Sequence, residues 1–328
     1  MKVGIIGAGM AGLACAQVLA ARKIAVSLFD KGRSPGGRMS SRRMATPLGE
    51  AVFDHGAQFI TAATPAFAAQ LRAWADAGVA APWPAAGAGS WVGVPAMNAV
   101  PKFMAIGCDI ALETQVRGMC RDAAGWYLVH EAGRAGSFDA MVVALPAEQA
   151  AAVLGLQNLP MARVAIGTPS TPCWTAMLAF GEAIPAPPVI RDRGIIAWAA
   201  CNNSKPGRHG VHCWTIQASA GWSRRHLEAE RDFVTASLRE AFAEIVGLPG
   251  LATIAETSHR WRFALSGSAG SEAIWDPATQ LGVCGDWLIG AGVENAWLSG
   301  RRLAELILTG VEQHHPQMRI GTAARLSR

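Results

Sequence analysis

Charged residues are scarce in this chain of 328 amino acids: 16% of them are Asp, Glu, Lys or Arg, and 51% are hydrophobic. No uninterrupted apolar stretch reaches about 18 residues, so the sequence predicts no membrane-spanning helix. The net charge of +5 is spread over scattered Lys and Arg, in runs no longer than two. We therefore expect no nucleic-acid partner, and the mild positive charge favours a pocket for a small anionic ligand.

Tyrosine and closely spaced cysteines are also rare. Tyr127 is the single tyrosine, and no two of the seven cysteines form a C-x-x-C pair. An odd number of dispersed cysteines predicts neither a disulfide framework nor a zinc site, so we expect no metal. This usage is typical of a reducing compartment and favours a cytoplasmic location.

The first thirty residues carry the strongest pattern. An apolar strand over residues 3–6 leads into Gly7-Ala8-Gly9-Met10-Ala11-Gly12, and a helical run separates this turn from a second strand, Ile24–Phe29. In G-x-G-x-x-G the first glycine allows a tight turn, the second lets a pyrophosphate approach the backbone, and the third packs the helix close to the sheet. Asp30 ends the second strand, where an acid can bind a ribose hydroxyl. Together these features predict a dinucleotide-binding site.

The same stretch has one other interpretation. Lys2, an apolar run and Ala20-Ala21 form the pattern of a secretory signal peptide. Gln17, Arg22 and the glycines interrupt that pattern, so we favour the dinucleotide site.

Periodicity along the rest of the chain predicts two domains. Helices are expected over residues 65–77, 228–246 and 297–309, and strands over residues 110–117, 125–130, 141–145, 174–180, 194–199 and 211–218, with a strand and turn over 281–287. The Pro- and Gly-rich stretch 82–95 is interpreted as a linker, and residues 312–328 as a loose polar tail.

We therefore predict an α/β fold with two parts. A Rossmann-type domain is expected from residues 1–75, 97–148 and 276–328. A second, smaller α+β domain, on a mixed or antiparallel sheet, is expected from residues 76–96 and 149–275.

Further motifs follow the first turn in a fixed order. They are the basic loop Lys31–Ser41 with Gly36-Gly37-Arg38, the segment Asp54-His55-Gly56-Ala57-Gln58-Phe59, the strand Val142–Pro146, and Gly285-Asp286 before the last helix. In this order the motifs resemble the flavin-containing amine oxidase superfamily. Asn203-Ser204-Lys205-Pro206, His259-Arg260-Trp261 and Cys284-Gly285-Asp286-Trp287 are most similar to bacterial renalase-like proteins.

The resemblance implies a non-covalently bound FAD in the first domain and a substrate site in the second. The implied FAD contacts are Gly7, Gly9, Met10, Ala11 and Gly12 for the pyrophosphate, Asp30 and Lys31 for the ribose, Gly37, Arg38 and Met39 for the diphosphate and ribityl chain, Gly56, Ala57, Gln58 and Phe59 for the isoalloxazine, Val116 for adenine, Asp286 for the ribityl–phosphate region and Val293 for the pyrimidine edge. His55 is considered as a covalent flavin anchor, but a structural loop histidine is favoured.

Two features of the chain favour FAD over NAD as the tightly held cofactor. Contacts come from both ends of the chain, so the ligand must be long, and no second strand–G-x-G-x-x-G–helix unit is present. Val293 lies at the start of the last helix, whose N-terminus would stabilise the negative charge of a reduced flavin.

The resemblance leaves the reaction open between three classes. Amine oxidases of the superfamily use an aromatic pair and a lysine near the flavin, yet only Lys205 lies in the second domain and Tyr127 lies in the first. Renalase-like oxidation of a dihydropyridine isomer of NAD(P)H needs no general base, because the product becomes aromatic. That reaction, with O2 as acceptor and hydrogen peroxide as product, is our first hypothesis. The alternatives are an amine oxidase or desaturase, and a non-enzymatic FAD-binding redox module.

Several side chains are candidates for contact with the substrate. The catalytic candidates are Gln58, Lys205 and Trp287, and the substrate-binding candidates are Asn203, Ser204, Lys205, Arg260 and Trp261. Each has a structural alternative: a capped loop Gln, a polar turn before Pro206, a strand Trp beside a solvated Arg, or a core Trp. Gly292 stands where the resemblance leads us to expect a basic residue, so one anchor for an anionic substrate is missing.

Overall fold

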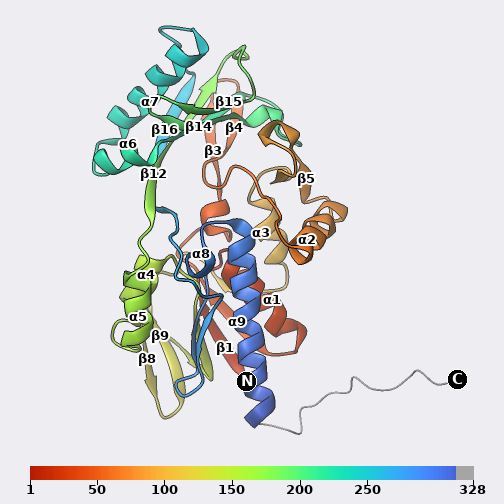
Figure 1. Cartoon of the computed structure of the whole chain (residues 1–328), viewed down its shortest axis with the longest axis vertical. Coiled ribbons are helices and arrows are strands. Elements are labelled where there is room, and N and C mark those ends of the chain that lie inside the picture. The colour runs from red at the N-terminus through yellow and green to blue at the C-terminus, as the bar shows by residue number, and fades with distance from the viewer. Residues whose placement is uncertain (315–328) are drawn as a thin grey trace, which may run out of the picture.

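The structure is a computed structural model that describes the backbone of residues 1–314 and the side chains of residues 1–310. Figure 1 shows an elongated molecule with the N-terminus in one half and a second sheet, flanked by α6 (Ala220–Arg225) and α7 (Arg231–Val246), in the other. The predicted tail lies outside the described residues from 315 onward, and residues 312–314 continue the last helix.

A six-stranded sheet forms the centre of the first half. Its order is β17 (Ile274–Asp276), β18 (Leu281–Val283), β11 (Ala140–Val143), β1 (Lys2–Ile6), β2 (Ala25–Phe29) and β7 (Asp109–Ala111). All neighbours pair in parallel except β17 and β18. The inner strands are apolar and buried, as parallel strands covered on both faces must be. The Rossmann-type domain is thus confirmed.

Two layers cover this sheet. One contains α1 (Met10–Ala21), α2 (Pro65–Asp76), α3 (Ala99–Met104) and α9 (Val293–His314). The other contains the three-stranded sheet β8 (Val116–Asp122), β9 (Gly125–His130) and β10 (Gly133–Phe138), with α4 (Ala147–Leu154) and α5 (Leu159–Ile166). Helices α1 and α9 lie side by side (Figure 1), and a Cβ on Gly300 would approach the Ala11 carbonyl to 2.1 Å. This contact packs the last described helix directly against the first.

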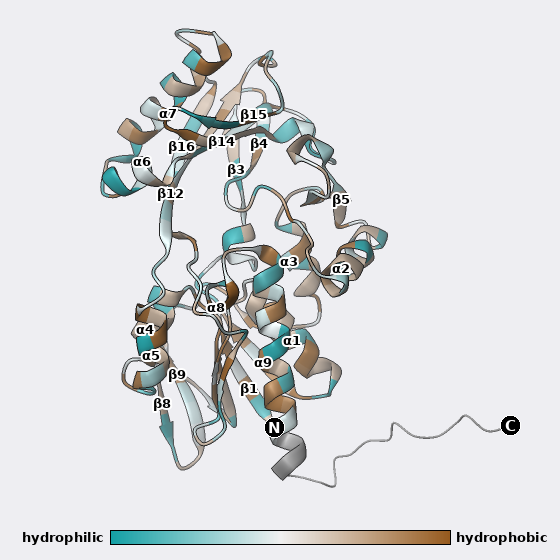
Figure 2. Cartoon of the chain, viewed as in Figure 1, coloured by the Kyte–Doolittle hydropathy of each residue, from teal (hydrophilic) through white to brown (hydrophobic). Residues whose placement is uncertain are grey.

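The second half is built on a five-stranded antiparallel sheet. The order is β13 (Val189–Arg193), β14 (Ile196–Cys201), β15 (His212–Ala218), β12 (Thr171–Phe180) and β16 (Ala255–Leu265). One face packs on α7 through Leu238 and Phe242. Apolar and hydrophilic residues alternate along α7 and α9 (Figure 2), as expected for helices with one buried side. The opposite face of the sheet is turned away from α7.

Two hairpins lie between the main sheets. The hairpin of β3 (Ser41–Thr46) and β4 (Gly49–Asp54) packs Phe53 against Met177 and Cys213 of the second sheet. The hairpin of β5 (Ala80–Pro82) and β6 (Trp91–Gly93) encloses Trp83, which is 1% exposed. The interpretation of residues 82–95 as a linker was therefore wrong, because Trp83 and Val92 are core residues.

Other boundaries also differ from the predictions. The single strand expected over residues 110–117 is two strands, β7 and β8, in different sheets. Strands β10, β13 and β16 were not predicted. Helices α4 and α5 bury Ala150, Leu154 and Ala165 in the same cluster as β8 and β9, so we propose a domain boundary after α5 rather than at residue 148. No helix within residues 1–314 is long and apolar enough to cross a membrane.

Candidate functional site

The glycine turn has the geometry of a phosphate cradle. Gly7 has a φ of +105°, and a Cβ on Gly12 would lie 2.0 Å from the Gly7 carbonyl oxygen, so neither position accepts a side chain. A Cβ on Gly9 would meet nothing within 4 Å. Helix α1 begins at this open space with no side-chain cap and no acid in its first turn. Its free N–H groups fit a pyrophosphate.

Asp30 holds this turn from the end of β2. Its Oδ2 accepts from the Ala8 amide at 2.7 Å, and its Oδ1 accepts from the Gly32 amide at 2.7 Å. The Thr114 amide donates to the Asp30 carbonyl, which brings the chain leading into Val116 alongside. Lys31 next to it is exposed. The residues expected to contact ribose, Asp30 and Lys31, therefore lie beside the segment of Val116, which is expected to contact adenine.

The second glycine loop lies against the first. The Gly36 amide donates to the Ala8 carbonyl at 2.9 Å, and a Cβ on Gly37 would lie 3.6 Å from the Cα of Gly9. Met39 is buried behind this loop. The Arg38 guanidinium is paired with Asp286, at 2.6 Å from Nη2 to Oδ1. The structure therefore brings the predicted diphosphate and ribityl residues into one group.

The loop after β4 lies between the two halves. A Cβ on Gly56 would be 2.0 Å from the Arg38 carbonyl and 3.4 Å from Cζ2 of Trp261. The Ala57 amide donates to the same Arg38 carbonyl at 2.9 Å. The Phe59 ring lies 5.2 Å from the Trp198 ring of β14. This loop, expected against the isoalloxazine, is thus fixed from both domains.

A row of four side chains crosses the second sheet above this loop. The strand register places Trp198, Gln217, Thr175 and His259 directly opposite one another on β14, β15, β12 and β16. Trp174 and Ala176 of β12 point to the other face, into the α7 cluster. Gln217 Nε2 donates to the Gly56 carbonyl at 2.9 Å, which shows that the row faces the loop.

Two histidines at the end of this row are held neutral. The rings of His55 and His259 are 5.1 Å apart in an edge-to-face arrangement, and the Trp261 indole donates to the His55 carbonyl. Burial lowers the pKa of His55 to about 3 and that of His259 to about 4. The charge of Arg42 lowers both pKa values further. At pH 7 the row therefore carries no charge of its own.

A buried ionic cluster lies beneath the loop. Asp54, which is 1% exposed, accepts from Lys205 Nζ at 3.2 Å and from Arg208 Nη2 at 2.6 Å. Its other oxygen accepts from the Met97 amide and the Ser41 hydroxyl. Burial alone raises the pKa of Asp54, but the two cations hold it below its ordinary value. Burial lowers the pKa of Lys205 to about 8.

Gln58 joins this cluster to the loop. Its Oε1 accepts from Lys205 Nζ at 3.3 Å, and its Nε2 donates to the carbonyls of Asp54 and Gly56. Its amide is therefore used within the protein. Lys205 is likewise enclosed, so these two of the three catalytic candidates contact protein groups rather than an open pocket.

Several candidate residues lie away from the site. The Asn203 side chain bonds the backbone of Gly210, Val211 and Cys213, and the Ser204 hydroxyl donates to the Cys201 carbonyl, so both fit the polar-turn alternative. Arg260 points to the α7 face and pairs with Glu228 at 2.8 Å.

Trp287 also lies away from the site. It is completely buried, and its indole donates to the Leu145 carbonyl. We therefore interpret it as a core tryptophan, which leaves Trp261 as the candidate beside the loop.

The start of α9 contains a residue that the sequence analysis missed. Glu294, next to Val293, accepts from the amides of Ala63 and Thr64 and from the Thr64 hydroxyl at 2.6–2.8 Å. It ties this helix to the loop before α2. Gly292, with a φ of +156°, begins the turn.

Two polar groups near the row lack a partner. Nε1 of Trp198 and Nδ1 of His55 are buried without a hydrogen bond in the described part of the chain. Buried groups of this kind usually indicate a ligand or water. Asp54, Arg208 and Gln217 were not predicted either, because no local motif identifies them.

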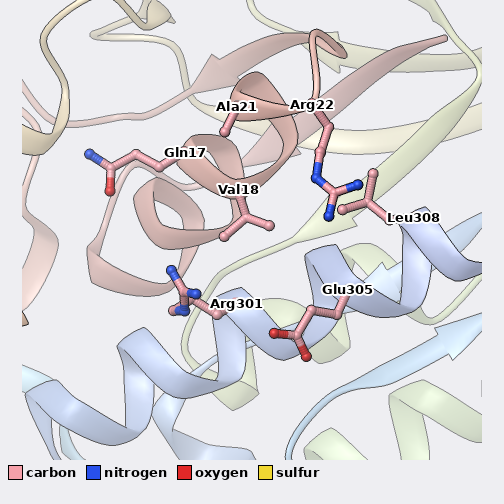
Figure 3. A pocket seen from close by; sticks show the side chains of 7 residues that line it. All are labelled: Gln17, Val18, Ala21, Arg22, Arg301, Glu305 and Leu308. Atoms are coloured by element: carbon pink, nitrogen blue, oxygen red, sulfur yellow. The ribbon is translucent and has the colours of Figure 1, made fainter. Parts of the chain in front are cut away.

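Two cavities lie outside the glycine loops. One of about 330 Å³ is formed by the second half of α1 and the middle of α9, with Gln17, Arg301 and Glu305 in its wall (Figure 3). It is remote from the phosphate cradle at the start of α1. The other, of about 480 Å³, reaches the end of the row at His259, with Arg231 and Glu230 in its wall. Among residues 1–310, whose side chains are described, there is no cluster of metal ligands.

Comparisons with known proteins agree with this architecture. A model of NAD(P)-binding Rossmann-like domains matches residues 5–74, and the model of the flavin containing amine oxidoreductase family matches residues 85–308. Because the second match covers more than half of the chain, the protein belongs to the flavin containing amine oxidoreductase family. It is a flavin-dependent oxidoreductase with FAD as its cofactor, and the glycine cradle and uncapped helix fit that group.

Solved structures show the same fold at low identity. A putative protoporphyrinogen oxidase from Exiguobacterium sp. 255-15 is similar at 12% identity and a TM-score of 0.70, over 95% of this chain and 99% of the other. Cyclohexylamine oxidase from Brevibacterium oxydans IH-35A is similar at 14% identity and a TM-score of 0.69, over 95% and 99%. A double mutant of putrescine oxidase, from a redesign of cofactor binding, is similar at 12% identity and a TM-score of 0.67. The match covers 94% of this chain and 99% of the other.

Proposed function

We propose that this oxidoreductase is renalase-like and oxidises dihydropyridine isomers of NAD(P)H. The substrate loses a hydride and becomes an aromatic pyridinium, so the driving force lies in the substrate itself. FAD, when bound, supplies a two-electron acceptor that takes hydride at N5 and is reoxidised by O2 to give hydrogen peroxide. A reducing cytoplasm suits the seven free cysteines.

The neutral row above Gly56 is the observation that carries this proposal. Trp198, Gln217 and Thr175 cannot ionise near pH 7, and burial keeps His259 uncharged. Asp54 is the acid nearest this loop in sequence, and Lys205 and Arg208 already neutralise it. A cationic ammonium substrate would find no carboxylate in the row to bind it, whereas an uncharged dihydropyridine ring needs none.

Aromatic side chains supply the surface that a flat ring requires. Phe59 and Trp198 are in contact on one side of the loop, and Trp261 lies against Gly56 on the other. Holding two rings face to face converts a bimolecular encounter into an oriented one, which can supply about 7–11 kcal/mol toward the barrier. Positioning is then the main task of the protein.

Positive charge beside the row suits the phosphates of a pyridine dinucleotide. The half-buried Arg42 has no carboxylate partner in the described part of the chain, and its charge acts on both histidines. Arg231 also lowers the pKa of His259, but it lies on the α7 face, where Glu228 and Glu230 share the wall of the same cavity. We propose Arg42 as the cationic anchor for these phosphates, in place of the basic residue that Gly292 does not provide.

An anaerobic titration tests the proposal. The purified holoprotein is mixed with 2- and 6-dihydro isomers of NAD(P)H, and flavin absorbance is followed by stopped flow. We expect stoichiometric bleaching by an isomer, with release of NAD(P)+, and no comparable bleaching by cyclohexylamine or putrescine.

Two results of the same titration would contradict the proposal. Bleaching by amines alone would replace the proposal with amine oxidation, and bleaching by none of the donors would favour the non-enzymatic redox module. Subsequent addition of O2 should yield one hydrogen peroxide per NAD(P)+ released.

A further inference from the structure

The cluster beneath the flavin loop has an unequal number of charges. It contains one carboxylate, that of Asp54, and two cations, Lys205 and Arg208. No other acid within residues 1–310, whose side chains the structure describes, forms an ion pair with either cation. All three side chains are at most 4% exposed, so water screens the surplus poorly.

The cluster also connects three distant segments. Arg208 Nη1 donates to the Gly93 carbonyl at 2.6 Å, and Asp54 Oδ1 accepts from the Met97 amide at 2.8 Å. Lys205 contributes the bond to Gln58 Oε1. Through Gln58 the cluster therefore holds the carbonyls of the loop that lies against the expected isoalloxazine.

The described groups that face Lys205 come from three segments. Asp54 and Gln58 approach it from the β4 loop, Arg208 and Cys201 from its own segment, and the Trp83 ring lies 5.1 Å from Nζ. Asp54 is ionised at neutral pH, and the buried Cys201 thiol has a raised pKa and is neutral. Of these groups, only Lys205, whose pKa is lowered to about 8, loses its charge between pH 7 and pH 10.

We propose that Lys205 is a positioning residue that fixes Gln58 and, with Arg208, gives this side of the flavin site one surplus positive charge. The reduced flavin carries negative charge near N1, whereas the oxidised flavin is neutral. The surplus charge therefore stabilises the reduced form and raises the midpoint potential of the bound FAD. This property does not depend on which substrate the enzyme oxidises.

Replacement of Lys205 by Met removes the surplus positive charge and leaves the Asp54 carboxylate paired with Arg208. In Lys205→Met, Asp54 keeps Arg208 as its partner and the cluster becomes neutral. The matched control is Lys102→Met, the same substitution at an exposed lysine of α3. Potentials of both holoproteins are measured with xanthine oxidase and a reference dye, a chemical reduction that needs no substrate.

The expected result is a lower potential for Lys205→Met at pH 7. At a fixed potential the reduced-to-oxidised ratio should fall about tenfold, equivalent to about 30 mV for a two-electron couple. The difference from wild type should close as pH rises through about 8, where wild-type Lys205 loses its proton. Lys102→Met should match wild type throughout. The visible spectrum of bound FAD should also shift in Lys205→Met, because Gln58 is released.

Two results would overturn the proposal. One is equal potentials for Lys205→Met and wild type at pH 7, and the other is a difference that persists unchanged at pH 9.5. If Lys205→Met does not retain FAD, the wild-type potential is measured alone between pH 6 and 10. A break near pH 8 would support the surplus charge, and a profile with no break there would refute it. Failure of the proposed substrate would leave these outcomes unchanged.

Discussion

Replacement of Asp54 by Asn should destabilise the protein severely. Asp54 is 1% exposed and accepts four hydrogen bonds, two of them from cations. In Asp54→Asn the amide keeps one acceptor oxygen but turns an N–H group toward Lys205 and Arg208. The cluster then holds two buried cations and no anion.

The magnitude follows from that charge. Breaking a buried ion pair by removing one partner costs about 3–5 kcal/mol, because the remaining charge stays buried and uncompensated. At about 2–4 °C per kcal/mol for a domain of this size, the melting temperature should fall by about 6–20 °C. Thermal unfolding of the holoprotein, followed by circular dichroism at equal and saturating FAD, measures the change.

A matched control separates burial from the loss of an ion pair. Glu50 pairs with Arg43 on the β3–β4 hairpin, and both side chains are more than half exposed. Glu50→Gln should cost less than about 1 kcal/mol. The double variant Asp54→Asn, Lys205→Met should recover part of the lost stability, because one of the two unpaired cations is gone. If Asp54→Asn unfolds within 2 °C of wild type, the buried cluster does not have the energetic role that we assign to it.

Three further predictions follow from the same geometry. Gly12→Ala should prevent correct folding of the first turn, since its Cβ would lie 2.0 Å from a carbonyl oxygen, whereas Gly9→Ala should leave the apoprotein stable and lower FAD affinity at least about tenfold, as measured by fluorescence titration. Stability should fall as pH drops from about 6.5 toward 4, because burial holds the folded pKa values of His55 and His259 at about 3 and 4, so the unfolded chain binds more protons in that window. Each histidine contributes at most about 3 kcal/mol over that window before screening by solvent, so the total loss should be several kcal/mol. Urea titrations at several pH values check this, and a flat profile would contradict it. Gln217→Glu places a carboxylate in the neutral row and should lower kcat/KM for dihydro-NAD(P) isomers by more than about tenfold, while Gln217→Met separates the effect of charge from loss of the bond to the loop.

The first turn and helix α7 could be predicted because their signals are local. Only glycine tolerates the φ of Gly7 or the space at Gly12, so the spacing itself specifies the turn. The periodicity of residues 231–246 likewise places one helix on one apolar face. The stretch with Trp83 was misread, because Pro and Gly indicate a break in regular structure but not whether the chain is buried.

The sequence by itself therefore determined the Rossmann-type domain, the cofactor cradle and the existence of a second sheet, since each depends on residues close together in the chain. Only the tertiary structure decided what surrounds the loop after β4. The neutral row needs the register of four strands, and Lys205 meets Asp54 across 151 positions of sequence. Contacts of that range are set by the packing of whole elements. No local pattern therefore encodes that Lys205 and Arg208 will share the buried carboxylate of Asp54.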